Sequence, residues 1–233
     1  MTVRDVTIAP EVAALVRVGL VEVDGVQVGP RSPALAAEIA ALVTAVRQRY
    51  AGREPARIEG LAPARELYHR IGIDPTKLRP SSEALLRRVL RGEDLPVINA
   101  VVDTSNLCSL DFLLPIGLHD LEAAVGPLVL RRGGPGEGYE AIGKGWYSVE
   151  GRLTLADAAG PCGSPTSDSR RTMVTERTRR VLMVIYAPST FPPQRLEAHA
   201  AQAAERMRRF VGGTPVGVAV LPAAATGDRR AEG

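Results

Sequence analysis

The stretch INAVVDTSN, residues 98–106, is an apolar segment that carries three amide or carboxylate side chains, Asn99, Asp103 and Asn106. Its β-branched residues predict a short strand over 97–102 that runs out into a polar loop. Polar side chains beside a buried strand cost free energy unless they find hydrogen-bond partners. The stretch therefore predicts a polar site where a strand ends, with these side chains holding either a ligand or the adjoining loop.

The segments around this stretch carry the signals of both helices and strands. Apolar residues at helical spacing predict helices over 34–50 and 63–71, one that begins at Ser81 or Ser82 as N-cap and ends at Gly92, and one over 192–211. Strands are predicted over 128–132, 145–149, 153–157, 181–186 and 214–221, with a strand or hairpin over 12–28 that bends at Asp24-Gly25. This order of elements predicts an α+β fold, a mostly antiparallel β-sheet core with packed helices.

The same order divides the 233 residues into four predicted segments. Residues 1–78 form an N-terminal strand and helix region packed on the core, 79–190 the core domain, and 191–221 a closing helix and strand. Residues 222–233 are small and polar, which predicts a disordered tail. A chain of this length accommodates one large domain or a core with an appended lobe.

Composition limits the classes of protein to which the chain can belong. Hydrophobic residues make up 45% and aromatic residues 4%, so a core must consist of Val, Leu, Ile and Ala. No apolar run predicts a signal peptide or a membrane span. Cys108 and Cys162 lack metal-ligand spacing, and we expect thiols in a reducing cytoplasm. The net charge of +3, carried by arginines apart from Lys77 and Lys144, permits a nucleic acid partner without proving one.

Several common catalytic motifs are absent from the sequence. It contains no GxxxxGK[ST] phosphate loop, no dinucleotide GxGxxG between strand and helix, no GxSxG and no HExxH. His69, His119 and His199 lie on different predicted elements, so they do not form a zinc set. A Ser–His–Asp triad built on His119 is a weak alternative. The sequence thus predicts a site without a metal or a cofactor.

Polar residues gather instead at strand ends and loops, most densely in DSRRTMVTERTRR, residues 168–180. These residues form either an exposed charged turn or a polar pocket at the rim of the sheet. A pocket without a nucleophile, metal or cofactor can still hydrolyse an activated ester. It needs to hold a water molecule and to place donors near the developing oxyanion.

The run LPVINAVVDTSNLCSLDFLLPIGLHDLEAAVGPLVLRR, residues 95–132, resembles the signature of the editing domain of the bacterial phenylalanyl-tRNA synthetase beta subunit, the B-three/B-four domain. The resemblance continues through GEGYEAIG at 136–143 and covers roughly 80–190. The whole chain resembles the stand-alone form of this domain. The resemblance implies the fold of that domain and the hydrolysis of wrongly charged aminoacyl-tRNA in a second pocket. Without a synthetic domain, the chain is expected to act in trans on free mischarged tRNA.

The resemblance also assigns residues to the site. Asn99, Asp103 and Asn106 fall on the family's N..VD..N pattern, and Asp120 falls on the aspartate that closes the signature. Gly117 takes the position of the family's site histidine, which implies that the pocket accepts an amino acid other than tyrosine. Two further matches are Glu137, with a glutamate of the stand-alone form, and Thr178, with the threonine that leads the last strand.

The expected function is a metal-independent aminoacyl-tRNA deacylase. A water molecule would attack the ester with help from the ribose hydroxyl, while Glu137 or Asp168 holds the α-amino group. A second carboxylate in the pocket would suit a cationic side chain, such as an arginine mimic. Two alternatives stay open: a non-catalytic module that binds tRNA or an amino acid, and a hydrolase or sensor for a small amide or ester.

The predicted site residues fall into three groups. The catalytic residues are Glu137, Asp168 and Thr178. The substrate-binding residues are Asn99, Asp103, Asn106, Gly117, His119, Asp120, Asp157, Ser169, Thr172 and Thr175. The RNA-binding residues are Arg131, Arg170 and Arg171.

Overall fold

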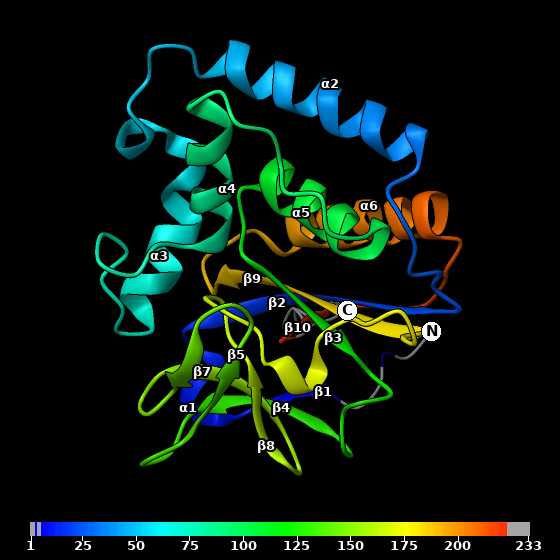
Figure 1. The fold of residues 1–233 in the computed structure, drawn as a ribbon. Coiled ribbons are helices and arrows are strands. Elements are labelled where there is room, and N and C mark those ends of the chain that lie inside the picture. The colour runs from blue at the N-terminus through cyan, green and yellow to red at the C-terminus, as the bar shows by residue number, and fades with distance from the viewer. Residues whose placement is uncertain (1–2, 4–5, 223–233) are drawn as a thin grey trace, which may run out of the picture.

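Two four-stranded sheets and a layer of helices make up the computed structural model, which describes residue 3 and residues 6–222 (Figure 1). One sheet has the strand order β10-β2-β9-β3 and the other β1-β4-β7-β8, and β5 and β6 form a separate hairpin. Every strand pair is antiparallel except β1 with β4. The strands are β1 Val6–Ile8, β2 Val16–Asp24, β3 Ile116–Asp120, β4 Leu128–Arg132, β5 Gly138–Ala141, β6 Gly145–Ser148, β7 Leu153–Asp157, β8 Gly160–Gly163, β9 Arg180–Pro188 and β10 Thr214–Leu221.

Strand β9 shows why the molecule has three layers. Its residues alternate between two hydrophobic cores, because successive side chains of a strand point to opposite faces. Val181, Met183 and Ile185 pack on the helices, whereas Val184 and Tyr186 pack between the two sheets. A strand buried on both faces reads as a continuous apolar run, as VLMVIY does.

Apart from the short helix at Pro10–Ala13, which packs on β4 of the second sheet, the helices gather on the other side of the β10-β2-β9-β3 sheet (Figure 1). The pattern-based prediction of α+β architecture with a mostly antiparallel sheet is confirmed. The sheet takes strands from each of the predicted segments 1–78, 79–190 and 191–221 and joins them in one core. The helices are α1 Pro10–Ala13, α2 Pro33–Arg49, α3 Ala62–Arg70, α4 Ser81–Leu90, α5 Ala100–Phe112 and α6 Pro193–Val211, with 3-10 turns at Pro55–Arg57, Glu59–Leu61 and Arg170–Thr172.

The strand predicted over 97–102 is wrong, because this stretch begins helix α5. Asn99 is the N-cap, and its side-chain oxygen accepts a hydrogen bond from Val102 N at 2.9 Å. Ten of the 13 residues of α5 are buried, so the helix has no polar face to reveal its period. Its β-branched residues therefore gave a strand signal that tertiary burial overrode.

Smaller differences concern helix caps and short strands. Neither Ser81 nor Ser82 caps α4, whose N-cap is Pro80 without a side-chain hydrogen bond. Residues 12–28 hold the single strand β2 rather than a hairpin, since β2 lies between β9 and β10. Both cysteines are free and buried. Most of the predicted tail, 223–233, lies outside the described residues. Among the helices that are described, none has the length and apolar character needed to cross a membrane.

Candidate functional site

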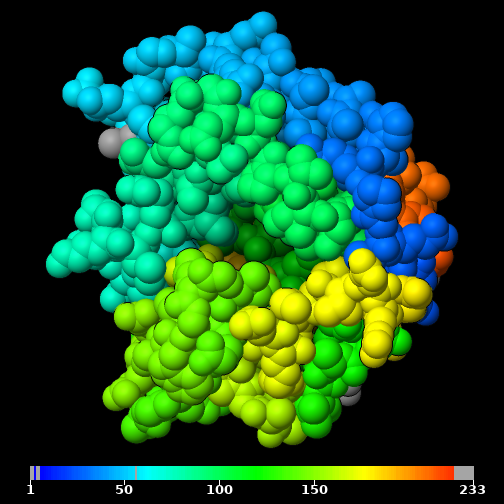
Figure 2. Space-filling view, viewed as in Figure 1, coloured from blue at the N-terminus to red at the C-terminus, as the bar shows by residue number. Residues whose placement is uncertain are grey.

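A cavity of about 230 Å³ lies between helix α5 and the edge strand β3. It opens beside a groove of about 580 Å³ that shares Ile98, Asn99 and Val174 with it. Figure 2 shows this face hollowed between the green helices and the yellow-green and yellow segments below them. The cavity walls are mostly apolar with a few polar groups, as in small-molecule sites generally. The lining residues are Ile98, Asn99, Val102, Ser105, Asn106, Ile116, Leu118, Ile142, Asp168, Met173 and Val174.

Helix α5 supplies one wall through residues spaced three or four apart. Asn99, Val102 and Asn106 share one face of the helix because of this spacing. The oxygen of the Asn99 side chain is used by the cap, which leaves its amide N–H groups as donors. Ser105 adds a hydroxyl to the same wall. This wall can therefore donate hydrogen bonds to an ester or carboxylate oxygen of a ligand.

Asp168 places a carboxylate in the cavity at the free edge of the sheet. β3 is an edge strand, and its Leu118 N–H donates to Asp168 Oδ2 at 3.0 Å. Oδ1 has no hydrogen-bond partner among the described residues. Burial raises the pKa of Asp168 to about 7, against the lowering effects of the Leu118 hydrogen bond and the charge of Lys144. No cation is paired with this carboxylate among those residues, so it can accept one from a ligand.

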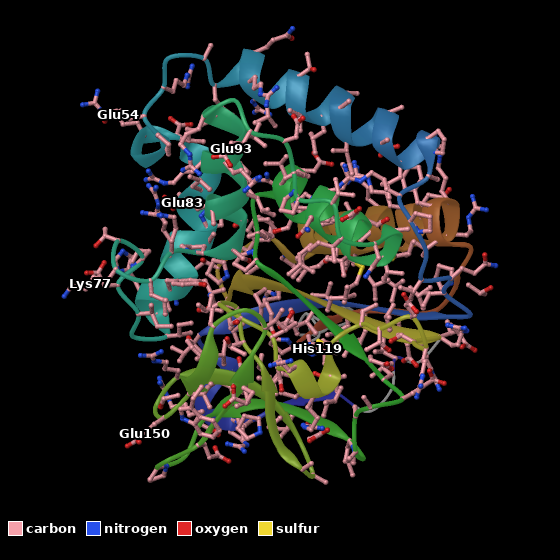
Figure 3. The ribbon with its side chains drawn as sticks, in the orientation of Figure 1. Glu54, Lys77, Glu83, Glu93, His119 and Glu150 are labelled. Atoms are coloured by element: carbon pink, nitrogen blue, oxygen red, sulfur yellow. The ribbon has the colours of Figure 1, made fainter. Side chains whose placement is uncertain are left out.

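His119 pairs across the sheet with Leu182, so its side chain faces the space between the two sheets, and it is not among the residues that line the cavity (Figure 3). Its Nδ1 lies 3.1 Å from Thr172 Oγ1, which donates to Cys162 O at 3.3 Å. Because that hydroxyl proton is used, Nδ1 is assigned as the N–H donor, and the lone pair of Nε2 faces outward. Nε2 stands 3.7 Å from Asp168 Oδ1. Burial, aided by the charge of Arg171, lowers the pKa of His119 to about 4.

The downward shift of the His119 pKa and the upward shift of the Asp168 pKa both favour the uncharged form of the group near pH 5 to 6. The proton resides on the carboxyl, which can turn it toward the imidazole nitrogen. Two lone pairs would otherwise face each other in a buried place, which is unfavourable. Burial therefore favours two uncharged groups, His119 and Asp168, next to each other.

Two glycines make room for this pair. A Cβ on Gly117 would lie 3.1 Å from both Asp168 Oδ1 and His119 Nε2. A Cβ on Gly163 would lie 2.3 Å from His119 Cε1, which is too close for any side chain. Residues 117 and 119 lie on the same face of β3. The imidazole of His119 therefore occupies space that a side chain at position 117 would need.

The other predicted carboxylates are held by arginines. The Glu137 carboxylate accepts two hydrogen bonds from the guanidinium of Arg131, at 2.6 and 2.8 Å. It accepts a third from Gly134 N at 2.6 Å. The Arg131 hydrogen bonds lower the pKa of Glu137 to about 2. These contacts fix the glycine-rich loop 133–138, and neither Glu137 nor Arg131 is among the residues that line the cavity.

Asp157 and Asp103 are similarly engaged. Asp157 pairs with Arg171 at 2.8 and 2.9 Å and accepts backbone N–H groups of two loops. Asp103 accepts Arg31 Nε at 2.9 Å and Ile98 N at 3.0 Å, and so anchors the chain that enters α5. These carboxylates hold loops in place around the cavity.

A second set of predicted residues braces the segment after Asp168. Thr178 donates to Asp120 Oδ2 at 2.6 Å and accepts a hydrogen bond from Thr175 N. The Ser169 hydroxyl accepts Arg171 N at 3.1 Å. Thr175 lines the adjoining groove, and Arg170 is exposed.

The structure thus brings Asn99, Asn106 and Asp168 together in the cavity, with Gly117, His119 and Thr172 behind them. The roles assigned to the remaining residues stay predictions. Sequence reasoning missed Ser105 and the apolar wall, Ile98, Val102, Ile116, Leu118, Ile142, Met173 and Val174. The helical spacing of Asn99, Val102 and Asn106 was the available signal, and the strand assignment concealed it. Among the described residues, no group of three or more His, Cys, Asp or Glu is placed to hold a metal ion.

Comparisons with known proteins were made for the whole chain. No curated protein matches it. Among solved structures it is similar to an N-terminal fragment of the phenylalanyl-tRNA synthetase beta subunit from Pyrococcus horikoshii, with 13% identity and a TM-score of 0.45. The similarity covers 90% of this chain and 49% of that one, so the chain spans about half the length of that fragment. The profile of the B3/4 domain matches residues 63–221, more than half of the chain. The chain belongs to the B3/4 domain family.

Proposed function

We propose that the chain is a trans-acting editing factor that hydrolyses the ester bond of mischarged aminoacyl-tRNA. The observation that carries the proposal is Asp168, a carboxylate without a cationic partner among the described residues, in a mostly apolar cavity. An aminoacyl ester presents an α-ammonium group next to a side chain. Asp168 would bind the ammonium group, and the apolar wall would contact the amino-acid side chain. Such a factor would work in the cytoplasm, where tRNA is charged.

The donors of helix α5 suit the chemistry of this ester. Water adds to the carbonyl carbon, and negative charge develops on the carbonyl oxygen before the bond to the ribose oxygen breaks. The amide N–H groups of Asn99 and Asn106 and the hydroxyl of Ser105 are the donors available for that oxygen. The neighbouring ribose hydroxyl can relay the proton from water to the leaving oxygen, so no strong protein base is needed.

The number of carboxylates in the cavity limits the kinds of amino acid that it can bind. Asp168 is the one carboxylate among the lining residues. If it binds the α-ammonium group, the remaining wall favours a largely apolar side chain. A cationic side chain or arginine mimic would instead have to take Asp168 for itself. A substrate panel that contains both kinds of amino acid separates these cases.

A non-catalytic tRNA- or amino-acid-binding module is the second candidate. It is favoured by the position of His119, which lies behind the sheet edge and does not line the cavity. Asp168 is then the one titratable side chain in contact with a ligand. A binding module needs the cavity and its donors, and no more.

Incubation with a panel of mischarged tRNAs, with loss of the ester bond as the readout, tests the proposal. Asp168→Asn keeps the shape of the side chain and removes its charge. A hydrogen bond to a charged group contributes about 1.5–3 kcal/mol, so we expect kcat/KM to fall about 10- to 100-fold. Glu137→Gln, outside the cavity, is the matched control and should retain activity. Tight tRNA binding without turnover would favour the binding module, and no tRNA binding at moderate salt would exclude the editing factor.

A further inference from the structure

A buried glutamate organises three arginines on the α3–α4 flank of the molecule. Glu83, in the first turn of α4, has a side chain only 3% exposed. It accepts Arg65 Nε and Arg87 Nε at 2.8 Å each, and Arg79 Nε lies 3.8 Å away. Burial opposes the ionisation of Glu83, but the hydrogen bonds from Arg65 and Arg87 outweigh it and lower its pKa. One negative charge therefore holds three positive charges in place.

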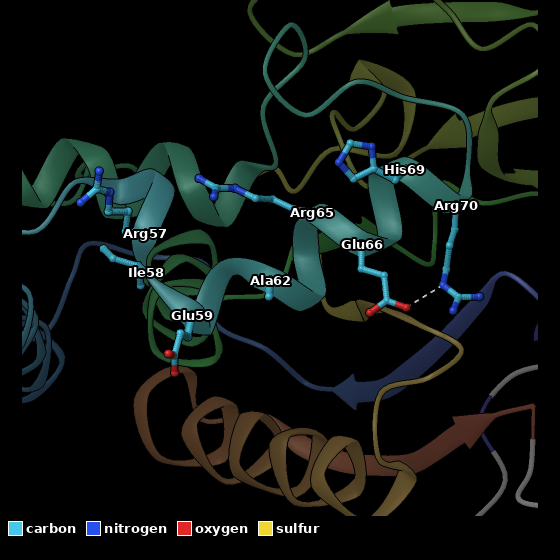
Figure 4. A pocket seen from close by; sticks show the side chains of 8 residues that line it. All are labelled: Arg57, Ile58, Glu59, Ala62, Arg65, Glu66, His69 and Arg70. Atoms are coloured by element: carbon cyan, nitrogen blue, oxygen red, sulfur yellow. Dashed lines mark hydrogen bonds and ion pairs between the residues drawn. The ribbon is translucent and has the colours of Figure 1, made fainter.

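The arginines line two adjoining hollows, and the excess of positive charge lies in the smaller one. One, of about 320 Å³, is lined by Arg65, Arg79 and Arg87 together with His69 and Thr76. The other, of about 720 Å³, shares Arg65 and His69 with the first and adds Arg57 and Arg70 together with Glu59 and Glu66, so the charges that it adds balance (Figure 4). Arg70 is neutralised by Glu66 at 2.7 Å. Arg79 and Arg87 have no second carboxylate to neutralise them within the described residues.

The chemistry of these hollows fits phosphate groups. Guanidinium groups bind phosphate oxygens in a fixed fork and are less strongly hydrated than lysine. The smaller hollow has about ten times the roughly 30 Å³ that a water molecule occupies in the liquid. Three guanidinium groups around one carboxylate leave a net positive charge at the smaller hollow, which suits the phosphates of a polyanion.

The location suits an RNA whose end lies in the candidate cavity. Helix α4 packs on α5, whose residues form the cavity wall. In Figure 3, Glu83 and Lys77 lie on the α3–α4 flank of the molecule. Resting on the proposed function, we propose that the cluster of Arg65, Arg79 and Arg87 around Glu83 binds backbone phosphates of the tRNA body.

The double variant Arg79→Gln/Arg87→Gln tests this inference. Arg65 remains as the counter-ion of Glu83, so the buried carboxylate keeps a partner. Arg208→Gln/Arg209→Gln removes the same two charges from α6, where they pair with Glu205 and Glu38. Binding of uncharged tRNA is measured as a function of salt concentration. We expect the log–log salt slope of the test variant to fall by about 1–2, with affinity about 10- to 60-fold weaker at 0.1 M salt.

Hydrolysis of two substrates separates this surface from the cavity. The test variant should raise KM for aminoacyl-tRNA and leave hydrolysis of 3′-O-aminoacyl-adenosine unchanged, because that ester lacks the RNA body. An unchanged salt slope, or an equal loss in the control variant, overturns the inference. Wild-type protein that binds tRNA without hydrolysing either ester would sink the proposed deacylase and leave this surface standing. Wild-type protein that does not bind tRNA overturns both.

Discussion

The cavity edge at Asp168 and the loop at Glu137 each bury part of a carboxylate, yet the two carboxylates have opposite properties. Asp168 meets a backbone N–H, a neutral imidazole and apolar walls, so burial raises the pKa to about 7. Glu137 meets the guanidinium of Arg131 and a backbone N–H, so its pKa falls to about 2. Both were predicted to be catalytic from the sequence.

The difference teaches which neighbours make a carboxylate available to a ligand. A carboxylate already paired with arginine is satisfied and fixes a loop, and a ligand ammonium would have to displace the arginine. A carboxylate that lacks a cation, at the floor of an apolar cavity, gains from binding one. The same contrast separates Asp168 from Asp157, which Arg171 holds.

Among the tests of this comparison, we expect the largest effect on the pH dependence of the free energy of unfolding. The folded pKa of His119, about 4, is below its ordinary 6.5, so the unfolded chain binds more protons and stability rises with pH between these values. The folded pKa of Asp168, about 7, is above its ordinary 3.8, so stability falls as pH rises over this window. In the wild type the two trends largely cancel between pH 4 and 6.5.

Removing one partner should expose the trend of the other. Relative to wild type, Asp168→Asn should gain stability as pH rises from 4 to 6.5, and His119→Asn should lose it from 4 to 7. Each slope should approach about 1 kcal/mol per pH unit. Urea unfolding at a series of pH values measures both. Parallel curves for the two variants would contradict the opposite pKa shifts of His119 and Asp168.

A steric substitution at the same site should have the next largest effect. Gly163→Ala forces a Cβ against the buried ring of His119 and should reduce the free energy of unfolding by about 1–3 kcal/mol. Gly117→Ala, with contacts of 3.1 Å, should cost less. Gly29→Ala, which meets no atom within 4 Å, is the control and should be near neutral. Equal stability of all three in thermal unfolding would contradict the packing described around His119.

The smallest effect is expected at the arginine-braced carboxylate. Glu137→Gln removes a partly exposed ion pair and should reduce stability by about 0.5–1.5 kcal/mol. Because the folded pKa of Glu137 is depressed, this contribution is present above about pH 4.5 and fades as pH falls through about 2. Turnover should stay within about twofold of wild type, since the pair does not line the cavity. A strong loss of kcat at unchanged stability would indicate that Glu137 is a catalytic residue.

Sequence patterns predicted the long elements well. The helices at 33–49, 62–70, 81–90 and 193–211 and the strand at 180–188 all follow clear apolar periods or runs. Patterns failed at α5, where burial on all sides removed the amphipathic signal. They also missed β3, β5 and β8, which are short and contain glycine where a neighbour approaches closely.

The sequence by itself determined the family and the fold class. It also marked Asn99, Asn106 and Asp168 as candidate site residues. These follow from local spacing and from a motif. Tertiary structure alone decided which carboxylate lacks a cationic partner. Arg131 lies six residues from Glu137 and Arg171 lies 14 from Asp157, whereas Asp168 meets Leu118, 50 residues away. The pKa of a carboxyl group depends on such neighbours in space, and their order along the chain does not specify them.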